Sequence, residues 1–315
     1  MPSAAPPRVF LLDGNSYIFR AFFATKNGDR QLFESDRSYP VACLPKSSLS
    51  PAPTHAIYGF TNMILGFVQR YQPEYFAVVL DSPGETFRRQ MFLDYKRNRL
   101  GAPADLKAQL PYIRQVLKAL NVSVVELEGY EADDLIATVC KSLSGGACEC
   151  VIVSSDKDLM QLITDRVKFL DTAKKRWITA EDVKTKFGVE PERVVEVMAL
   201  MGDAVDNIPG VKGIGEKTAI ALIRRFGTLD NLFANLDQIE ATGMRGAART
   251  RKVLENGKNA AFLSRELATL MADLPIRMEL EDLRFLRPEI RRLLALFSDL
   301  ERVPSGGRHD CVDCN

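Results

Sequence analysis

The chain has 315 residues, 46% of them hydrophobic, so it can bury the core of one large domain or of two ordinary ones. Six cysteines in a chain of this length do not make a disulfide framework, and a formal net charge of +1 gives no overall attraction to nucleic acid. No apolar run approaches the roughly 18 residues of a membrane helix and the start MPSAAPPR lacks a signal-peptide core, so we expect a cytoplasmic protein that has reduced thiols and no membrane partner.

Five short apolar runs rich in β-branched residues are typical of strands buried on both faces. In chain order they are residues 8–13, 75–81, 122–128, 150–156 and 167–171. Between them, apolar residues recur at helical spacing over 56–71 and 131–143. This alternation predicts an α/β fold with a mostly parallel central sheet.

The pattern changes near Gly188, where strand signals fade and helical periods such as VVEVMALMG and KTAIALIRRFG take over. We therefore predict an α/β domain over 1–187 and a helical domain over 188–304. Two segments look irregular, 25–54 and 305–315, and we expect the second to be a disordered tail. The tail contains an HxCxxC cluster without an evident fourth ligand, so metal binding there stays an open alternative.

Acidic residues recur where predicted strands end and where predicted helices begin. They are Asp13, Asp81, Glu131, Asp133, Asp134, Asp156, Asp158, Asp203 and Asp206. Singly, each has a plainer explanation as a turn former or a helix cap. Ligands gather beyond the carboxyl ends of the strands in α/β sheets, however, so we expect several of these side chains to converge. Two carboxylates about 5 Å apart repel by roughly 3 kcal/mol at an effective dielectric of 20, so a converging set predicts bound cations.

The chemistry of these ligands indicates which cations. Oxygen ligands favour hard ions such as Mg²⁺ or Mn²⁺, and two ions about 3.5–4 Å apart suit in-line attack on a phosphodiester. His55 and His309 are the only histidines of the chain, which disfavours a zinc site or a histidine-based mechanism.

A locally basic segment follows the strand predicted to end at Asp81. It carries Arg88, Arg89, Lys96, Arg97, Arg99 and Lys107, with Phe87, Phe92 and Tyr95 interleaved. Cations and aromatic rings together suit the backbone and bases of a nucleic acid. A solvated, charge-rich helix is the alternative, but the position beside Asp81 favours a role in holding phosphate.

A run of glycines, Gly210, Gly213 and Gly215, precedes a predicted helix that begins near Glu216. Backbone amides at such a place can receive phosphate oxygens. Glu216 stands where a nucleotide-binding P-loop has its lysine, before Lys217 and Thr218, so we expect no nucleotide cofactor. A plain turn between helices is the alternative to a hairpin that grips the DNA backbone.

Five motifs, in this order, resemble the successive signatures of the 5′-nuclease family, closest to the 5′-to-3′ exonuclease domain of bacterial DNA polymerase I. They are LLDGNSYIFRAFFA, VVLDSPGETFRRQMFLDYKRNR, YEADDLIATV, SSDKDLMQLI and ALMGDAVDNIPGVKGIGEKTA, and the similarity extends from Arg8 to about residue 300. The resemblance implies a resolvase-like (PIN-like) α/β domain with a helical arch over about 82–110. A helical domain with a helix-three-turn-helix DNA-binding motif would follow.

The resemblance also implies roles for single residues. All nine carboxylates match the family's metal-binding positions. Arg20, Lys96 and Arg99 match basic active-site positions that place phosphate and stabilise developing charge, and Tyr95 matches a stacking position. The residues expected to bind DNA are Arg88, Arg89, Gly210, Gly213, Gly215, Lys217 and Thr218.

The function implied is a structure-dependent 5′-to-3′ DNA exonuclease and 5′ flap endonuclease that uses two ions of Mg²⁺ or Mn²⁺. A K⁺ ion at the helix-three-turn-helix is a further option. We expect a monomer that acts on 5′ ends, flaps or nicks, and since no polymerase follows, nick processing would depend on a separate enzyme. A catalytically silent DNA-junction-binding protein is disfavoured by the complete carboxylate set, and a related ribonuclease by the glycine hairpin.

Overall fold

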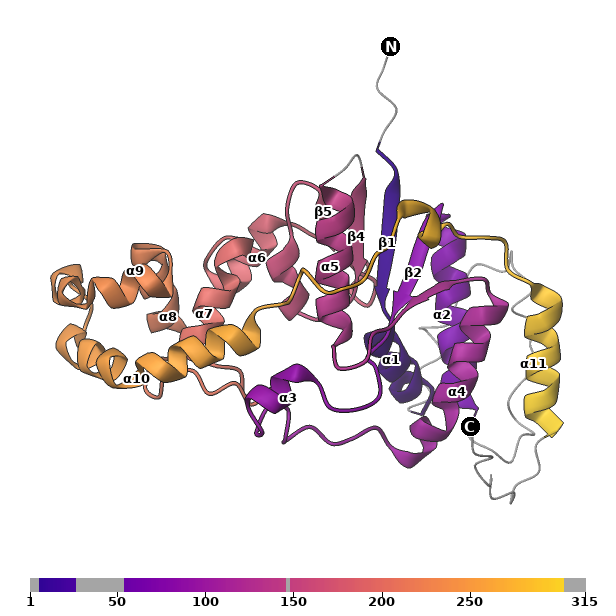
Figure 1. Ribbon diagram of the computed structural model, residues 1–315, viewed down its shortest axis with the longest axis horizontal. Helices are drawn as coiled ribbons and strands as arrows, with labels where there is room; N and C mark the ends of the chain where they lie inside the picture. The colour runs from indigo at the N-terminus through magenta and orange to yellow at the C-terminus, as the bar shows by residue number, and fades with distance from the viewer. Residues whose placement is uncertain (1–5, 27–53, 146–147, 303–315) are drawn as a thin grey trace, which may run out of the picture.

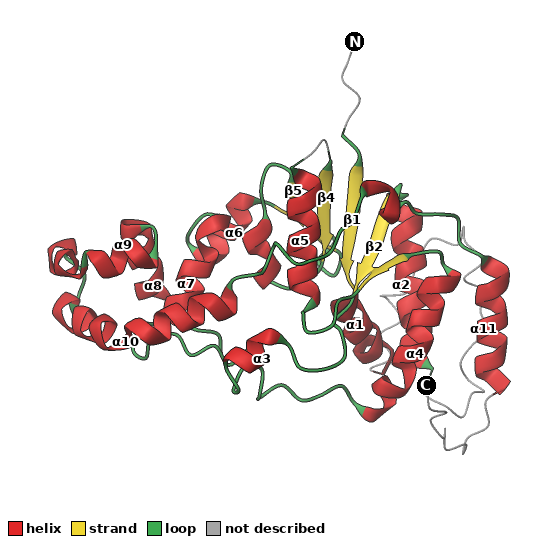
Figure 2. Cartoon of the chain, viewed as in Figure 1, coloured by secondary structure: helices red, strands yellow, loops and turns green. Residues whose placement is uncertain are grey.

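The computed structural model describes residues 6–26, 54–145 and 148–302. Figures 1 and 2 show a central sheet with helices on both faces, from which an elongated group of helices extends to one side. The predicted irregular segment 25–54 lies outside the described residues except for its ends, and so does the tail with the HxCxxC cluster. None of the described helices combines the length and the hydropathy needed to cross a membrane.

The sheet has six strands in the order β3-β2-β1-β4-β5-β6. Their bounds are β1 Arg8–Asp13, β2 Tyr75–Val79, β3 Ser123–Val125, β4 Glu149–Val153, β5 Val167–Asp171 and β6 Arg176–Ile178. The first five are parallel, and β6 runs antiparallel to β5. From β1 the chain adds β2 and β3 on one side, and it then returns to add β4, β5 and β6 on the other side of β1. Loops that leave neighbouring strands at such a switch point diverge and leave room for a ligand.

The observed strands follow the predicted ones, with differences that matter for the site. β2 ends at Val79 and β4 at Val153, so Asp81 and Asp156 lie in the loops that follow rather than in strands. The predicted strand over 122–128 shrinks to three residues, because only Ser123–Val125 pairs with β2. β6 was not predicted, since three residues are too few to show an alternating pattern.

Helices cover both faces of the sheet (Figure 1). One face packs against α1 Gly14–Lys26, α2 His55–Tyr71, α4 Ala104–Ala119 and α11 Ile290–Arg302. The other packs against α5 Ala132–Ser144 and α6 Ala180–Phe187. The helices predicted over 56–71 and 131–143 are confirmed as α2 and α5. Their apolar residues were recognisable because they recur at helical spacing on the side that the sheet covers.

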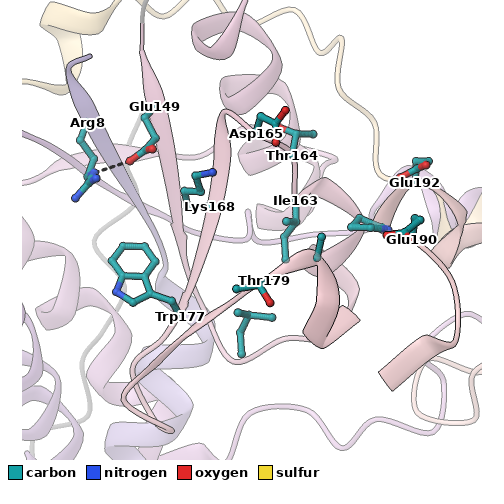
Figure 3. A pocket seen from close by; sticks show the side chains of 13 residues that line it. Arg8, Glu149, Ile163, Thr164, Asp165, Lys168, Trp177, Thr179, Glu190 and Glu192 are labelled. Atoms are coloured by element: carbon teal, nitrogen blue, oxygen red, sulfur yellow. Dashed lines mark hydrogen bonds and ion pairs between the residues drawn. The ribbon is translucent and has the colours of Figure 1, made fainter. Parts of the chain in front are cut away.

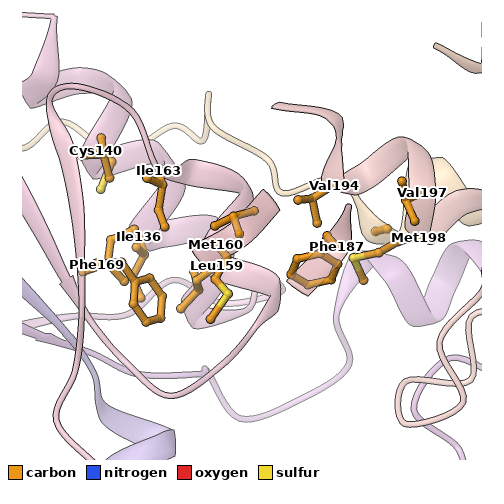
Figure 4. Packing of buried hydrophobic residues seen from close by; sticks show 14 of the residues in the cluster. Ile136, Cys140, Leu159, Met160, Ile163, Phe169, Phe187, Val194, Val197 and Met198 are labelled. Carbon is orange, nitrogen blue, oxygen red and sulfur yellow. The ribbon is translucent and has the colours of Figure 1, made fainter. Parts of the chain in front are cut away.

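The remaining helices form the elongated part of the molecule. They are α7 Val194–Met201, α8 Glu216–Phe226, α9 Leu229–Ala234 and α10 Ala247–Ala268, with the short 3₁₀ helices η5 Pro191–Arg193 and η6 Leu236–Thr242. Two other 3₁₀ helices belong to the α/β part: η4 Asp158–Leu162 follows β4, and η7 Leu280–Leu283 packs on β2. Figure 4 shows buried side chains that continue from Ile136 and Phe169 beside the sheet, through Met160 and Phe187, to Val197 in α7. The sheet and these helices therefore share one hydrophobic core.

After α10 the chain returns to the sheet. Phe285 donates its backbone N–H to the Glu74 carbonyl oxygen at 2.8 Å. In α11, Phe297 is fully buried and its ring centroid lies 4.6 Å from that of Tyr58 in α2. Residues beyond α10 thus pack on the α/β part, and the division of the chain at 187/188 stays a prediction.

The predicted arch over 82–110 is helical only at its ends, in α3 Phe87–Met91 and at the start of α4. Turns fill the middle because two residues are held against the body of the protein. Tyr95 is buried, and Lys96 has a left-handed φ of 53° and donates its backbone N–H to the Asp206 carbonyl oxygen at 2.9 Å. These contacts place the basic side chains of the segment next to the acidic residues.

Candidate active site

Asp13, the last residue of β1, lies at the switch point of the sheet. The Ser16 backbone N–H donates to its Oδ1 at 3.0 Å, and the Ser154 hydroxyl, directly after β4, donates to its Oδ2 at 2.7 Å. Burial raises the pKa of Asp13 to about 6; the two hydrogen bonds oppose this shift, and the negative charges of Asp156 and Asp81 add to it. Asp13 is therefore a carboxylate that is costly to ionise without a cation nearby.

The turn after β4 presents two more carboxylates. The Ser154 hydroxyl accepts the Asp156 backbone N–H at 2.9 Å, and Asp156 Oδ1 accepts the Asp158 N–H at 2.9 Å. Burial and the charge of Asp156 raise the pKa of Asp158 to about 7. Its Oδ1 is buried and has no hydrogen-bond partner. An orphaned buried oxygen of this kind fits a ligand that is still to be bound.

The loops after β2 and before α5 supply the other unpaired acids. Asp81 accepts the Ala132 backbone N–H at 2.7 Å and so caps α5. Asp133 follows in the first turn of that helix, and its pKa is raised well above the usual value by burial and then by the charges of Asp156 and Asp13. Asp13, Asp81, Asp133, Asp156 and Asp158 are called the open cluster below, because no ion pair joins any of them to a described cation.

A second set of carboxylates, the paired group, consists of Glu131, Asp134, Asp203 and Asp206, each of which has a basic partner. Lys96 Nζ lies 2.8 Å from Glu131 Oε1 and 3.8 Å from Asp206 Oδ2. Arg99 pairs with Asp206, and Lys157 with Asp203. Burial alone would raise the pKa of Glu131, but the positive charges of Lys96 and Arg88 outweigh it and the pKa is lowered.

The most buried of these pairs joins Arg88 to Asp134, with side chains 1% and 0% exposed. Two guanidinium nitrogens of Arg88 donate to the two carboxylate oxygens of Asp134, both at 2.6 Å, and the Met271 backbone N–H donates to Asp134 Oδ1 at 2.8 Å. Arg88 also donates to the carbonyl oxygens of Leu267 and Thr269, each at 2.9 Å. The pair thus ties the base of the arch to the end of α10.

These contacts correct two predictions from the sequence. Asp134 cannot turn a free oxygen toward a metal while Arg88 and a backbone amide occupy both of its oxygens. Arg88 cannot reach a DNA backbone because its guanidinium is enclosed by protein. The motif could not reveal this, because an arginine in the sequence looks the same whether its side chain is buried against a carboxylate or exposed to solvent.

Two further site predictions are wrong for reasons of packing. Tyr95 is only 4% exposed and donates its hydroxyl to Glu131 Oε2 at 3.0 Å, so it cannot stack on a base in this arrangement. Gly210 is buried with a φ of +61°, and an added Cβ would lie 2.4 Å from the Gly202 backbone nitrogen. It is a glycine because the two loops touch there, not because DNA approaches.

Arg20 lies on α1 at the same edge of the sheet. Its Nη2 donates to Thr172 Oγ1 at 3.1 Å, and its guanidinium carbon lies 4.3 Å from the ring centroid of Tyr17. The other two guanidinium nitrogens are buried without a hydrogen-bond partner. Arg20 is therefore positioned by one hydroxyl and one ring, with donors left for an anion.

The predicted hairpin lies on the helical side. Gly213 and Gly215 are exposed, and Gly215 is the N-cap of α8, with Lys217 and Thr218 in the first turn. Beside it, a groove of about 490 Å³ between α6 and α8 is lined by Lys184, Lys186, Lys217 and Arg224, among others. Arg89, the other predicted DNA contact, is exposed and lies 3.6 Å from Glu85.

The sequence reasoning missed residues that organise the site. Lys157 stands between Asp156 and Asp158 in SSDKD and forms an ion pair with Asp203. Its two acidic neighbours were a signal that its charge would lie among carboxylates. Ser154 links Asp13 to the turn after β4, and a serine directly after a predicted strand was the only sign of it.

The open cluster suits hydrated divalent ions better than a closed metal cage. Across the described residues, no three side chains among His, Cys, Asp and Glu converge closely enough to hold an ion by themselves. Mg²⁺ commonly keeps several waters and binds through one or two carboxylates, so an open arrangement fits it. The raised pKa values and the orphaned Asp158 oxygen fit the same role.

Two family models match consecutive parts of the chain. Residues 8–188 match the 5'-3' exonuclease N-terminal resolvase-like domain, and residues 189–291 match the 5'-3' exonuclease C-terminal SAM fold. This chain belongs to the 5'-3' exonuclease family. The family resemblance and the α/β fold with a helical second part, both predicted from the sequence, are confirmed.

Comparisons with individual proteins support the same assignment. A 5'-3' exonuclease of Aquifex aeolicus is 35% identical over 93% of this chain and 92% of its own length. DNA polymerase I of Caldicellulosiruptor bescii is 38% identical over 93% of this chain, which spans only 32% of that polymerase. Among solved structures, the T5 5'-exonuclease with bound zinc ions superposes with a TM-score of 0.63 at 22% identity, over 84% of this chain and 90% of that one. The last comparison shows a shared fold.

Proposed function

We propose that this chain is a structure-dependent 5′-to-3′ DNA exonuclease and 5′ flap endonuclease that hydrolyses phosphodiester bonds with two divalent ions, Mg²⁺ or Mn²⁺. The observation that carries the proposal is the open cluster at the switch point of the sheet, where Asp13, Asp133 and Asp158 have raised pKa values and no basic partner. The similarity to free-standing 5'-3' exonucleases supports the reaction class.

The open cluster would hold the ions. Asp13 and Asp156, on either side of the switch point, and Asp158, with its free buried oxygen, are the strongest ligands by position. Asp81 and Asp133 complete the negative surface. When bound, divalent ions supply Lewis acidity and neutralise charge on the scissile phosphate. The protein's own task is to keep these oxygens turned inward, which the hydrogen bonds from Ser16 and Ser154 do for Asp13.

Three cations border the cluster and would act on the substrate. Lys96 and Arg99 are held by Glu131 and Asp206 yet stay 23% and 44% exposed, so each has a face for a phosphate oxygen. Arg20 brings two unsatisfied nitrogens from α1. Donors fixed in advance around a phosphate stabilise the charge that develops during cleavage, and such a donor commonly contributes about 3 kcal/mol.

The duplex beside the cut would lie along the helical part. The exposed amides at Gly213 and Gly215, the start of α8 and the basic groove with Lys217 suit DNA phosphates. A K⁺ ion on the backbone carbonyls of this hairpin is part of the proposal. We propose that the protein works as a monomer on 5′ ends, flaps and nicks.

The test is cleavage of 5′-labelled flap, nicked and single-stranded DNA with Mg²⁺, with Mn²⁺ and with EDTA. We expect metal-dependent cleavage that Asp156→Ala lowers at least about a thousandfold while flap binding persists; Asp237→Asn, which removes an exposed acid in η6, should cut normally. Tight flap binding by the parent protein without cleavage in either metal would instead identify a silent junction-binding protein. Preference for an RNA flap would identify the ribonuclease alternative.

A further inference from the structure

A second pocket lies where the parallel strands begin, at the end of the sheet opposite the open cluster. Figure 3 shows its lining. It measures about 730 Å³, and its lining includes Arg8 in β1, Glu149 in β4, Lys168 in β5 and Trp177 in β6. Arg8 begins β1, and Asp13, at the other end of this six-residue strand, belongs to the open cluster. At about 3.3 Å per residue, the two ends are about 16 Å apart. The pocket is thus separate from the proposed nuclease chemistry.

The charges of the pocket do not suit DNA. Four carboxylates line it, those of Glu149, Asp165, Glu190 and Glu192, against the two cations Arg8 and Lys168. Arg8 Nε forms an ion pair with Glu149 Oε1 at 2.6 Å, and Lys184 Nζ forms one with Glu190 Oε1, also at 2.6 Å. Asp165 and Glu192 are exposed and form no ion pair with any described residue. Lys168 also forms no ion pair with any described residue, so the lining carries two unpaired carboxylates and one unpaired ammonium and favours a cation over a polyanion.

Trp177 adds a surface that favours a particular cation. It is the single tryptophan of the chain, lies on the edge strand β6 and is 43% exposed. Figure 3 shows its indole and Arg8 on one side of the pocket, with Glu190 and Glu192 on the other. The Arg8 guanidinium carbon lies 6.0 Å from the ring centroid, at the outer limit of a cation–π contact. Arg8 therefore contacts the indole only weakly, and much of the Trp177 side chain stays open to solvent.

The floor of the pocket is apolar. Ile163, Ile178 and Pro191 are buried beneath the charged rim. An apolar floor below an indole and carboxylates matches a side chain with an aliphatic stem and a planar cationic head. Arginine has this shape, and its guanidinium stacks on an indole and pairs with carboxylates, which a compact ammonium does less well. Tryptophan and arginine are also the residues most enriched at the energetic centre of protein interfaces.

We propose that this pocket is a docking site for an arginine-bearing segment of a partner protein. The arginine lies on the Trp177 indole, its stem contacts the apolar floor, and the unpaired carboxylates of Asp165 and Glu192 attract its charge. A partner bound there leaves the open cluster free, because the pocket lies at the other end of the parallel strands. The site would therefore connect the nuclease to another protein without covering the open cluster.

The single tryptophan makes the test direct, because the emission of Trp177 reports on the pocket alone. The probe is a blocked six-residue peptide with two arginines among glycine and leucine, titrated into the full-length protein at 0.15 M salt. We expect a saturable change in Trp177 emission and at least about tenfold weaker binding when both arginines are replaced by glutamine. Glutamate in their place should abolish the response. Equal responses to the arginine and glutamine peptides would overturn the proposal.

Variants distinguish binding in this pocket from attraction of the peptide to acidic side chains elsewhere on the protein. Asp165→Asn and Glu192→Gln should each weaken the arginine peptide about twofold to fivefold, as loss of one exposed ion pair does. Asp237→Asn removes the same charge from η6 and should leave the affinity unchanged. If all three variants weaken binding equally, the peptide binds the protein's overall field and the proposal fails.

Two further measurements complete the design. Calorimetry on Trp177→Leu, which loses the emission signal, should show at least about tenfold weaker peptide binding. Spermine, a cation without a peptide backbone, should bind at least about tenfold more weakly than the peptide; equal binding would assign the pocket to polyamines instead. None of these variants should alter flap cleavage, so the outcome is independent of the nuclease assay.

Discussion

The open cluster and the paired group are both made of acidic residues near the carboxyl ends of the strands, yet the pKa shifts found in the two sets run in opposite directions. In the open cluster, burial and mutual repulsion raise the pKa of Asp13, Asp133 and Asp158. In the paired group, Lys96 and Arg88 lower the pKa of Glu131, and Lys157 lowers that of Asp203 against the effect of burial. The members of the open cluster have no ion-pair partner among the described residues, whereas each member of the paired group has a basic side chain beside it. The nine positions look alike in the sequence, and the difference lies in which of them already have a counter-charge.

The largest effect should come from breaking the buried pair. Arg88→Met leaves Asp134 fully buried without a counter-charge, so we expect the free energy of unfolding to fall by about 3–5 kcal/mol. Arg89→Met is the matched control, because Arg89 is 55% exposed and its partner Glu85 is equally open to solvent. Urea unfolding should show a change of less than about 1 kcal/mol for that control. Similar losses for both variants would show that Arg88–Asp134 is not a structural pair.

The second prediction concerns Lys96, a cation that the paired group holds beside the open cluster. Lys96 holds Glu131 and Asp206 and has a partly exposed ammonium, so Lys96→Ala should slow single-turnover cleavage at saturating DNA on the order of a hundredfold. Its neighbour Arg97 pairs with Asp94 and is 74% exposed, so Arg97→Ala is the control and should cut at the parent rate. A Lys96→Ala protein with normal turnover and weak DNA binding would assign the lysine to affinity rather than to chemistry.

The third prediction uses pH to expose the strain in the open cluster. Because the folded protein raises the pKa of Asp13 from 3.8 to about 6, folding favours its protonated form. That contribution is fully present below about pH 4 and is lost as pH rises through 6. In EDTA, the parent should therefore lose up to about 3 kcal/mol relative to Asp13→Asn between pH 4 and pH 8. Parallel stability curves for the two proteins would contradict the raised pKa.

Mg²⁺ gives the same experiment a second arm. A cation bound to the cluster should restore stability to the parent at pH 8 and do less for Asp13→Asn, because a ligand that binds only the folded state stabilises it more the tighter it binds. Asp237→Asn should follow the parent throughout. Equal stabilisation of all three proteins by Mg²⁺ would mean that the ion acts elsewhere.

The smallest effect should come from the helical side, where contacts are many and shared. Lys217→Ala removes one phosphate contact, so the slope of log affinity against log salt should become shallower by about 0.9 with turnover unchanged. Lys184 lines the same groove but shares its charge with Glu190, so Lys184→Ala should change the slope by less than Lys217→Ala does.

Gly215→Val sharpens that prediction. Gly215 has a φ of −94° and an added Cβ would meet nothing within 4 Å, so the variant should fold normally, which circular dichroism can check. It should weaken duplex binding by covering the amides at the start of α8. Normal binding combined with poor cleavage would place the hairpin in the chemistry instead.

Much of the architecture followed from the sequence alone. Short apolar runs predicted the strands of the parallel sheet, and apolar residues at helical spacing predicted α2 and α5, because burial on both faces and burial on one face leave different patterns in the sequence. Strand ends placed Asp13, Asp81 and Asp156 at one edge, since parallel strands share a direction. The start of α8 at Glu216 followed from the glycines before it.

Tertiary structure alone decided which of these residues are free. Asp133 and Asp134 are adjacent in sequence, yet one faces the open cluster and the other is enclosed by Arg88 and Met271, because successive residues of a helix point in different directions. The same is true of Gly210 and Gly215, one pressed against Gly202 and one open to solvent. Composition and spacing determine which groups come to an edge, but the partner of each charge is set by contacts between residues that lie far apart in the chain.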